Sequence, residues 1–364
     1  MEIRYVDELL TPAALVDVAR MEANLDRMAR YTADAGLALR PHTKTHKTPE
    51  LAAEQLKRGA VGVTVATVRE AEVMSAVADD ILIAYPPVGA QKLERMMHIP
   101  DRVRLAVALD SSEALNELGD AARSHKRNIG VLVEVDAGMN RVGLADPEQV
   151  AALARTVGDH AFLEFRGLLF YPGHIREPVF EQPAAIPRVN TLLAQHINAV
   201  RAAGLDPQII SGGSTPAAFL AHSFEYINEV RPGTYIFNDR TTAAIGACEW
   251  SDCAYTVLAT VVSTAVPGQA VVDAGSKALS REDIRGADAP GFGALLDRPD
   301  VFVRALSEEH GILDLSRTDW RPRVGDRVRI VPNHVCVSVN LHDKLWAVRG
   351  DEVVGWWPIA ARNW

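Results

Sequence analysis

The sequence is poor in cysteine and has no long apolar stretch. Cys248, Cys253 and Cys336 are its only cysteines in 364 residues. This low, odd number is typical of a reduced, cytoplasmic protein, so we expect free thiols and not a Cys248–Cys253 disulfide. No apolar run approaches the roughly 20 residues that cross a bilayer. Residues 1–8 also lack the basic and apolar regions of a signal peptide, so we expect neither a membrane segment nor a leader.

The chain also lacks a basic surface signal. Its net charge is −9, and its Lys and Arg residues are scattered, without a dense run. Nucleic-acid binding normally needs a positive patch, so we exclude it as a function. Hydrophobic residues make up 48% of the sequence, which is enough for a real core, and the length allows one large domain with a smaller one.

From about residue 12 to residue 240, short apolar runs alternate with amphipathic stretches. The pattern predicts helices over 21–35, 49–58, 68–78, 111–124, 147–157 and 186–203. Eight strands are predicted between and beside them, over 14–18, 36–40, 62–67, 81–85, 103–109, 129–135, 165–171 and 208–211. Eight such repeats in about 230 residues favour an α/β fold, a (β/α)8 TIM-type barrel. A doubly wound sheet is the alternative, although no Gly-x-Gly-x-x-Gly follows the first strand.

After about residue 250 the pattern changes to short, β-branched segments. Strands are expected over 253–266, 270–272, 324–331 and 346–348. We therefore predict a barrel domain over residues 11–245 and a mostly β C-terminal domain over residues 246–364, the latter with residues 1–10 as a possible addition.

A lysine motif follows the second predicted strand. In Arg40-Pro41-His42-Thr43-Lys44, Pro41 stops the strand and places Lys44 at the carboxyl end, where barrel enzymes carry out chemistry. A lysine there can bond covalently to an aldehyde cofactor if its pKa is low, and cations such as Arg40 or His46 would lower it. The alternative is a solvated loop lysine.

A glycine-rich turn lies farther along the chain, at Ser211-Gly212-Gly213-Ser214-Thr215-Pro216. It has the order of a strand, a turn and a helix start, with Ser214 or Thr215 as the helix cap. Backbone N–H groups that converge in such a turn bind a phosphate, helped by the positive end of the helix. An ordinary strand-to-helix turn has the same residues.

The segment from Val331 to Asn340 alternates strictly, which predicts a strand. Val335, Val337 and Val339 would share one face. The other face would carry His334, Cys336, Ser338 and Asn340. Imidazole and thiolate two residues apart can ligate one zinc ion and leave positions open for water and substrate. A buried cysteine beside a hydrogen-bonded histidine is the alternative.

The stretch Arg40-Pro41-His42-Thr43-Lys44-Thr45-His46-Lys47 resembles the signature of the D-threonine aldolase and D-serine dehydratase family, whose fold is of the alanine-racemase type. The resemblance covers nearly the whole chain. It implies that Lys44 carries pyridoxal 5'-phosphate (PLP), with Lys47 as a neighbour. It also implies which residues contact the phosphate and the ring of the cofactor. The phosphate loop would comprise Gly212, Gly213, Ser214, Thr215, Gly233, Thr234 and Tyr235.

The same resemblance assigns the remaining site residues. Arg141, in a motif shared with alanine racemases, would approach the phenolic oxygen of the cofactor, unless it pairs with Asp136 or Glu134 instead. Tyr171 would meet the pyridine nitrogen. His174 is a candidate acid or base, because its pKa lies near neutrality. His334 and Cys336 would hold a divalent metal, with zinc expected and manganese or magnesium as alternatives.

Cys336 favours the dehydratase branch, because members of that branch show His-x-Cys where aldolases show His-x-Asp. We therefore expect a PLP- and metal-dependent lyase that removes water from 3-hydroxy D-amino acids and yields a 2-oxo acid and ammonia. Retro-aldol cleavage to glycine and an aldehyde is the alternative. An amino-acid racemase and a non-catalytic PLP-binding protein are less favoured. A homodimer is expected by resemblance alone.

Overall fold

The computed structural model describes residues 3–363, and its internal contacts divide the chain into two compact units. The first unit contains residues 28–233 and the segment from Ala361 onwards. The second contains the residues up to Arg27 together with Thr234–Ala360. Within residues 3–363, no helix combines the length and the apolar character that a membrane crossing requires.

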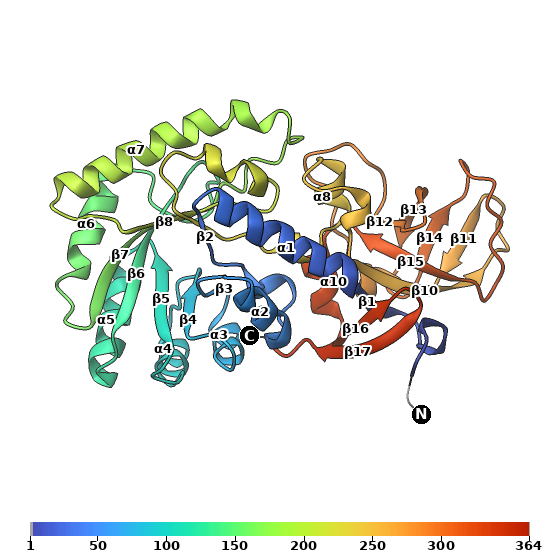
Figure 1. The fold of residues 1–364 in the computed structure, drawn as a ribbon, viewed down its shortest axis with the longest axis horizontal. Coiled ribbons are helices and arrows are strands. Elements are labelled where there is room, and N and C mark those ends of the chain that lie inside the picture. Colours follow the sequence, from blue (N-terminus) through green and yellow to red (C-terminus); the bar gives the residue numbers. More distant parts are fainter. Residues whose placement is uncertain (1–2, 364) are drawn as a thin grey trace. The chain divides into compact units, whose positions relative to one another are not determined.

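The first unit is a barrel of eight parallel strands (Figure 1). The sheet order is β2-β9-β8-β7-β6-β5-β4-β3, and the bridge between His42 and Thr64 joins its two ends. The strands are β2 (Ala38–Leu39), β3 (Val63–Val65), β4 (Asp80–Ile83), β5 (Arg104–Leu109), β6 (Ile129–Val135), β7 (Leu163–Phe170), β8 (Ile209–Gly212) and β9 (Glu229–Val230). The expected TIM-type barrel is confirmed.

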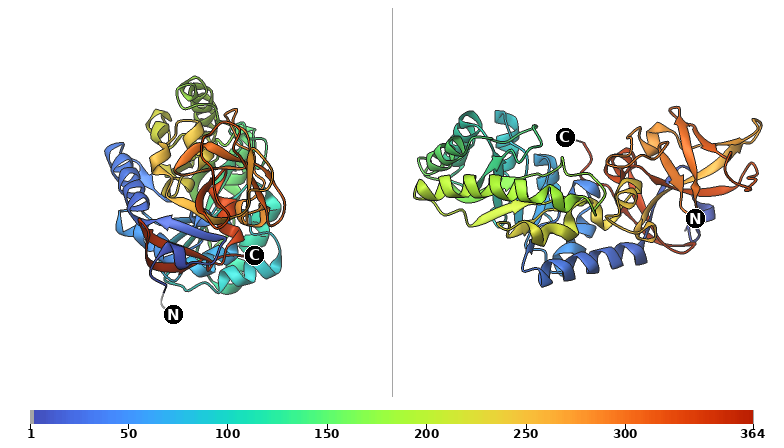
Figure 2. Two further views of the ribbon diagram at one scale, coloured as in Figure 1. Left: turned by 90° about the vertical axis from the view of Figure 1, so that its right-hand side faces the viewer. Right: turned by 90° about the horizontal axis from the view of Figure 1, so that it is seen from above.

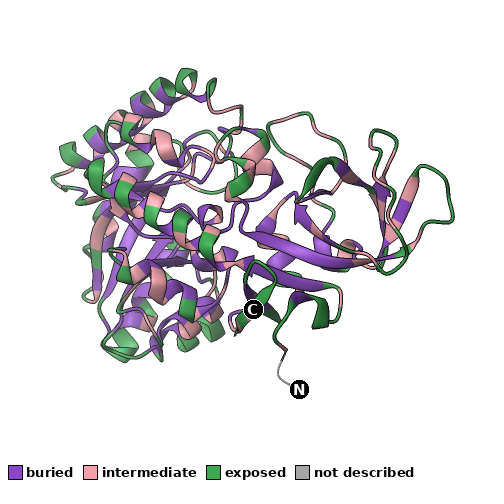
Figure 3. Cartoon of the chain, turned by 45° about the vertical axis from the view of Figure 1, so that its right-hand side comes forward, coloured by how far each residue is buried: buried purple, intermediate pink, exposed green. Residues whose placement is uncertain are grey.

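Helices cover the outside of these strands, and their buried residues face inwards (Figure 3). On α5, for example, Leu115, Leu118 and Ala122 recur at helical spacing and are buried. All seven residues of β6 are buried, as a strand covered on both faces requires. The helices are α2 (Pro49–Lys57), α3 (Val68–Met74), α4 (Ala90–Met97), α5 (Ser112–His125), α6 (Pro147–Val157) and α7 (Ile186–Ala202). A further helix, α1 (Val18–Asp34), is divided between the two units at Arg27.

Two strand assignments differ from the sequence-based prediction. The segment predicted as the first barrel strand is β1 (Ala13–Asp17), and it belongs to the sheet of the second unit, between β10 and β16. There Leu15 packs with Leu258 and Val348, a contact over more than 240 residues that no local pattern reveals. Its place in the barrel is taken by β9, whose two residues are too few to give a periodic signal. The helix α4 was also missed.

The second unit is built on a nine-stranded sheet of order β11-β14-β13-β12-β15-β10-β1-β16-β17, with β11 also paired to β10. Its strands, orange to red in Figure 2 except for β1, curve around one another. They are β10 (Tyr255–Ser263), β11 (Gln269–Val272), β12 (Gly293–Leu295), β13 (Arg298–Leu306), β14 (Gly311–Asp314), β15 (Arg327–Pro332), β16 (Lys344–Arg349) and β17 (Glu352–Pro358). Short helices α8 (Arg240–Ala244), α9 (Ser276–Leu279) and α10 (Val335–Leu341) complete it. The mostly β C-terminal domain is thereby confirmed.

The predicted strand over 331–340 is wrong beyond Pro332, because Val335–Leu341 form the helix α10. Val335, Ser338 and Val339 are buried, which is a helical spacing and not an alternating one. Ser338 donates its hydroxyl hydrogen to the Ala278 carbonyl at 2.7 Å and lies 2.9 Å from the Tyr255 hydroxyl. These tertiary contacts outweigh the β propensity of a valine-rich segment.

A buried polar network links the strands of the barrel. The Glu229 carboxylate on β9 accepts hydrogen bonds from Arg40 Nε at 2.7 Å and from the Ser211 hydroxyl at 2.6 Å. Arg40 also pairs with Asp80, at the start of β4. Arg231 donates to Ser211 Oγ at 2.5 Å and to the Phe170 carbonyl at 2.9 Å. Arg40 thus faces two carboxylates, and Arg231 is joined to Glu229 through Ser211, so each buried guanidinium is linked to negative charge.

Glu229→Gln should lower the free energy of unfolding by about 3 kcal/mol or more, because it leaves buried arginine charge without its partner. Glu164→Gln is the matched control. Its carboxylate lies 3.3 Å from Arg166 in an exposed pair, so the change should stay within about 0.5 kcal/mol. Denaturant unfolding of both variants measures the difference, and equal effects would contradict the role given to Glu229.

Candidate functional site

Three residues from separate sequence motifs lie together in the barrel unit. Lys44 lies on a short 3-10 helix, Thr43–Thr45, immediately after β2. Its Nζ is 5.9 Å from the ring centroid of Tyr171, which follows β7. The guanidinium carbon of Arg141, from the loop after β6, is 5.1 Å from the same centroid. Loops at the carboxyl ends of parallel strands meet at one end of a barrel, where catalytic residues gather.

The groups around Lys44 differ from the expected ones. Burial lowers the pKa of His46 to about 4, so this ring is neutral at pH 7. It lies 3.2 Å from Gln55 Oε1 and accepts a hydrogen bond from Thr48 N. Arg40 is neutralised by its two carboxylate partners. The prediction that Arg40 or His46 supplies a free positive charge beside Lys44 is therefore wrong.

His42 is the residue whose ring contacts the lysine segment directly. Its Nδ1 accepts a hydrogen bond from the backbone N–H of Lys44 at 3.5 Å. Burial, with smaller contributions from Lys44 and Arg231, holds the pKa of His42 well below its usual range. The ring is neutral for that reason, and it fixes the backbone of Lys44 without adding a charge.

Lys47 lies in a different environment from Lys44. Its Nζ is 3.6 Å from the buried carboxylate of Glu70, on α3. Burial raises the pKa of Glu70, although the Ala66 N–H and the Lys47 charge oppose this effect. Lys47 is thus held by an ion pair, whereas the Lys44 amine lies near an aromatic ring.

The loop after β6 carries Arg141. The Asp136 carboxylate accepts backbone hydrogen bonds from Gly138 at 2.9 Å and Asn140 at 3.0 Å, and so shapes the loop. Burial raises the pKa of Glu134 to about 7, opposed in part by Arg231 and Arg141. Asp136, one alternative partner of Arg141, therefore bonds to the backbone of its own loop. Glu134, the other, is buried, and Arg141 is close enough to lower its pKa.

His174 is exposed. Its ring lies against Gly138, where a Cβ atom would come within 3.2 Å of the imidazole. The structure thus brings His174 to the loop that carries Arg141.

The glycine-rich turn after β8 forms a cradle. Gly213 has a φ of +89°, and a Cβ at Gly212 would lie 2.2 Å from the Phe170 ring. Gly233 N donates to Thr215 Oγ1 at 3.2 Å, so the two predicted parts of the phosphate loop are in contact. A Cβ at Gly233 would lie 2.9 Å from the His42 carbonyl oxygen. Both segments therefore need glycine for close approach of the backbone.

The expected helix start at this turn is wrong. After Thr215 the chain forms a turn, and then a 3-10 helix over Ala218–Ser223, which Ala217 precedes without a side-chain cap. Ser214 Oγ is buried and has no hydrogen-bond partner among residues 3–363. A buried hydroxyl without a partner is costly. A phosphate bound in the cradle would accept its hydrogen bond, so these residues fit the cofactor without a helix dipole.

The predicted metal pair lies in the second unit, at the start of α10. His334 is the residue before the helix, and Cys336 is its second residue. Burial opposes the charged form of His334, but Cys336 and Asp239 outweigh this effect and raise its pKa. Cys336 Sγ lies 3.8 Å from Thr234 Oγ1. Thr234 and Tyr235, which were predicted to belong to the phosphate loop, also lie in this second unit, and Tyr235 is buried.

Asp239 was missed by sequence reasoning. Its buried carboxylate lies 3.2 Å from His334 Nδ1 and accepts the Val335 N–H at 3.1 Å. A carboxylate on Nδ1 leaves Nε2 of the imidazole as the metal-binding atom. Imidazole and thiolate side by side, with this support, fit a divalent metal such as zinc. Asp239 also caps α8 through Thr242, and this capping pattern was the available signal.

Comparison with known proteins gives matches along the whole chain. Residues 16–241 match the family described as alanine racemase, N-terminal domain, and residues 254–348 match the putative serine dehydratase domain. D-threonine aldolase of Arthrobacter sp. is 33% identical over 97% of this chain and 93% of its own length. D-threo-3-hydroxyaspartate dehydratase of Delftia sp. is 33% identical over 95% and 96%.

Solved structures agree with these matches. The Delftia dehydratase has a TM-score of 0.90 at 32% identity and covers 100% of both chains. D-threonine aldolase from Filomicrobium marinum has a TM-score of 0.89 at 33% identity and covers 100% of this chain and 98% of its own. With a barrel that carries Lys44 and a β unit that carries His334 and Cys336, the chain belongs to the family of D-threonine aldolases and serine and hydroxyaspartate dehydratases, built on an alanine-racemase-type fold.

Proposed function

We propose that the protein is a PLP- and divalent-metal-dependent lyase that eliminates water from 3-hydroxy D-amino acids. The pair His334 and Cys336, supported by Asp239, carries this proposal. Two solved variants of a D-threo-3-hydroxyaspartate dehydratase support it. One replaces a histidine, and the other replaces a cysteine two positions later and is described in the metal-free form. That dehydratase therefore has a histidine and a cysteine at the same spacing as His334 and Cys336, and its cysteine variant is described in a metal-free form.

Barrel residues would hold the cofactor. Lys44 would bind its aldehyde, the cradle of Gly212, Gly213 and Ser214 its phosphate, and Tyr171 its ring nitrogen. Thr215 and Gly233 complete the cradle through their hydrogen bond. When bound, PLP supplies an electron sink that stabilises negative charge at Cα of an amino acid. Arg141 lies next to Tyr171. Its fixed positive charge would favour the anionic form of the phenolic oxygen of the cofactor.

Side chains of the protein would carry out the proton transfers of the elimination. Once the amino group of the substrate has displaced it from the cofactor aldehyde, Lys44 Nζ is a free amine and takes the proton from Cα of the substrate. The bond between Cβ and the hydroxyl oxygen then breaks, and the hydroxyl leaves as water after it takes up a proton. We propose His174 as an acid or base for such transfers, because its ring reaches the Arg141 loop. The released enamine hydrolyses to a 2-oxo acid and ammonia.

The metal held by His334 and Cys336 would supply Lewis acidity to the β-hydroxyl. We propose zinc, because a thiolate ligand favours it over the manganese or magnesium that oxygen ligands prefer. Thr234 lies beside the thiolate at 3.8 Å and would help to orient it. A cytoplasmic location is proposed from the low cysteine content, and a homodimer from the family alone.

Retro-aldol cleavage is the second candidate, because a specific observation favours it. The Arthrobacter relative, as similar in sequence as the dehydratase, is a D-threonine aldolase. In that reaction a base removes the hydroxyl proton, the bond between Cα and Cβ breaks to release an aldehyde, and Cα takes up a proton to give glycine. Lys44, Arg141 and the metal pair would serve both reactions.

Lys44→Ala should abolish turnover and the visible absorbance of bound cofactor, since no amine remains to bond the aldehyde. Lys47→Ala is the control. It removes the ion pair with Glu70 but should keep the absorbance. Absorbance spectra of both purified variants with added PLP decide the matter, and a spectrum that survives in Lys44→Ala would show that another lysine is the anchor.

Asp239→Asn should weaken zinc binding by about 10- to 100-fold, the usual effect of losing a carboxylate on a ligating histidine. Cys336→Ser should lower the zinc content at that site further. Titration of chelator-treated holoenzyme with zinc measures both affinities. Asp252→Asn, a carboxylate that pairs with Arg27 in the same unit, is the control. Zinc affinity unchanged in Asp239→Asn would remove Asp239 from the site.

Product analysis separates the two reactions. With D-threonine and zinc, elimination predicts 2-oxobutanoate and ammonia in equal amounts. Glycine and acetaldehyde would show instead that the retro-aldol reaction dominates and that Cys336 does not mark a dehydratase. L-threonine, which presents the opposite face at Cα, should give neither set of products.

A further inference from the structure

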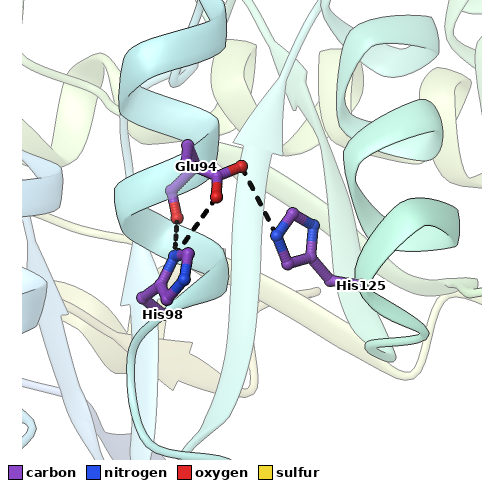
Figure 4. Close-up of side chains that lie close together, drawn as sticks. All are labelled: Glu94, His98 and His125. Atoms are coloured by element: carbon purple, nitrogen blue, oxygen red, sulfur yellow. Dashed lines mark hydrogen bonds and ion pairs between the residues drawn. The ribbon is translucent and has the colours of Figure 1, made fainter.

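Three potential metal ligands gather at the end of two neighbouring barrel helices. Glu94 lies on α4, His98 directly follows that helix, and His125 is the last residue of α5 (Figure 4). Helices of a parallel barrel run opposite to its strands, so their carboxyl ends lie at the amino ends of the strands. This cluster is therefore at the opposite end of the barrel from the loop that carries Lys44.

The distances within the cluster suit a small cation. His125 Nε2 lies 3.4 Å from Glu94 Oε2, and His98 Nδ1 lies 3.6 Å from Glu94 Oε1. One ligand atom of each residue lies within 4.8 Å of those of the other two. Ligands about 2.1 Å from a tetrahedral zinc ion are about 3.4 Å apart, so small side-chain rotations would bring all three into position.

The state of the His125 ring also suits metal binding. Its Nδ1 lies 3.0 Å from the carbonyl oxygen of Ala121, one helical turn earlier, to which it donates. The lone pair of a neutral ring is then on Nε2, the atom that faces Glu94. His98 differs, because its Nδ1 donates to the Glu94 carbonyl oxygen at 2.8 Å and the lone pair of its neutral ring is on Nε2, so this ring must turn to present that atom. The two rings lie edge to face, with centroids 5.7 Å apart.

The backbone beneath the cluster is held in place by Arg127. This buried guanidinium donates to the carbonyl of Met97, at the end of α4, at 2.7 Å, and to the carbonyl of Ile99. Arg127 lies two residues after His125, so it ties the ends of both helices together. The guanidinium of Arg127 thus bonds to these carbonyl oxygens and not to the Glu94 carboxylate. Arg127 therefore holds the backbone that carries the cluster, whereas the three side chains are exposed and would be oriented by the ion itself.

We propose that Glu94, His98 and His125 form a binding site for a divalent transition metal of the zinc type, distinct from the His334 and Cys336 site. Two imidazoles and one carboxylate suit zinc, nickel or copper, and water would fill the remaining position. The competing interpretation is that the Glu94 carboxylate only forms hydrogen bonds with the two histidines. In that case added zinc would not bind to the cluster.

The experiment uses PLP-loaded, chelator-treated Cys336→Ser protein, so that the thiolate site does not mask the cluster. After dialysis against zinc, one bound equivalent is expected, with a higher melting temperature than without zinc. The equivalent should disappear in the doubly substituted proteins Cys336→Ser with His125→Ala and Cys336→Ser with Glu94→Gln. It should persist when His310→Ala, an exposed histidine elsewhere, is combined with Cys336→Ser. Zinc binding that is absent in Cys336→Ser, or unchanged by His125→Ala, would overturn the proposal.

Cobalt keeps this test separate from that of the proposed function. Cobalt at His334 and Cys336 should show a thiolate-to-metal charge-transfer band, whereas cobalt at the helix cluster should not. In otherwise unchanged protein, His125→Ala should remove one equivalent of cobalt and keep that band. A missing band would count against the thiolate site alone, and an equivalent retained in His125→Ala would count against the cluster alone.

Discussion

The Glu229 carboxylate is the interaction on which the barrel end with Lys44 depends. It bonds to Arg40, which follows β2, and to Ser211, which lies on β8. Through Ser211 it reaches Arg231 and the carbonyl of Phe170 on β7. Each of these segments leads directly into a site element, namely the lysine loop, the glycine-rich cradle, Gly233 and Tyr171. One buried acid therefore sets the relative positions of four loops that are distant in the sequence.

The charge around Lys44 follows from burial more than from proximity. His42 and His46 are both neutral because their burial disfavours the charged ring. Arg40, which is close in the sequence, pairs with Glu229 and Asp80. Arg231 is joined to Glu229 through the Ser211 hydroxyl. The neutral His42 ring accepts a hydrogen bond from the backbone N–H of Lys44, and the His46 ring accepts one from Thr48. Arg141 and Lys44 themselves place positive charge over the Tyr171 ring. Sequence alone suggests a cationic cluster, because it shows residue types without their partners.

Much of the barrel and its site could be predicted, since the relevant signals are local. Proline after a strand, glycines before Ser214 and apolar runs such as β6 each report on a few neighbouring residues, and parallel strands place the ends that follow them together. The misses arise from long-range contacts. β1 pairs with strands more than 200 residues away, β9 is two residues long, and α10 is helical because Asp239 and Tyr255 hold a valine-rich segment that would otherwise favour a strand.

The pairing of β1 has a consequence for the order of events during synthesis. Leu15 pairs in register with Trp346, so the second unit cannot complete its sheet until the chain has been made at least as far as β16. The barrel strands, in contrast, all lie between Ala38 and Val230 and are available much earlier. Domains generally fold as units as they emerge. The N-terminal strand must therefore wait, unpaired, while the barrel strands are made behind it, until β10 gives it a first partner and β16 a second.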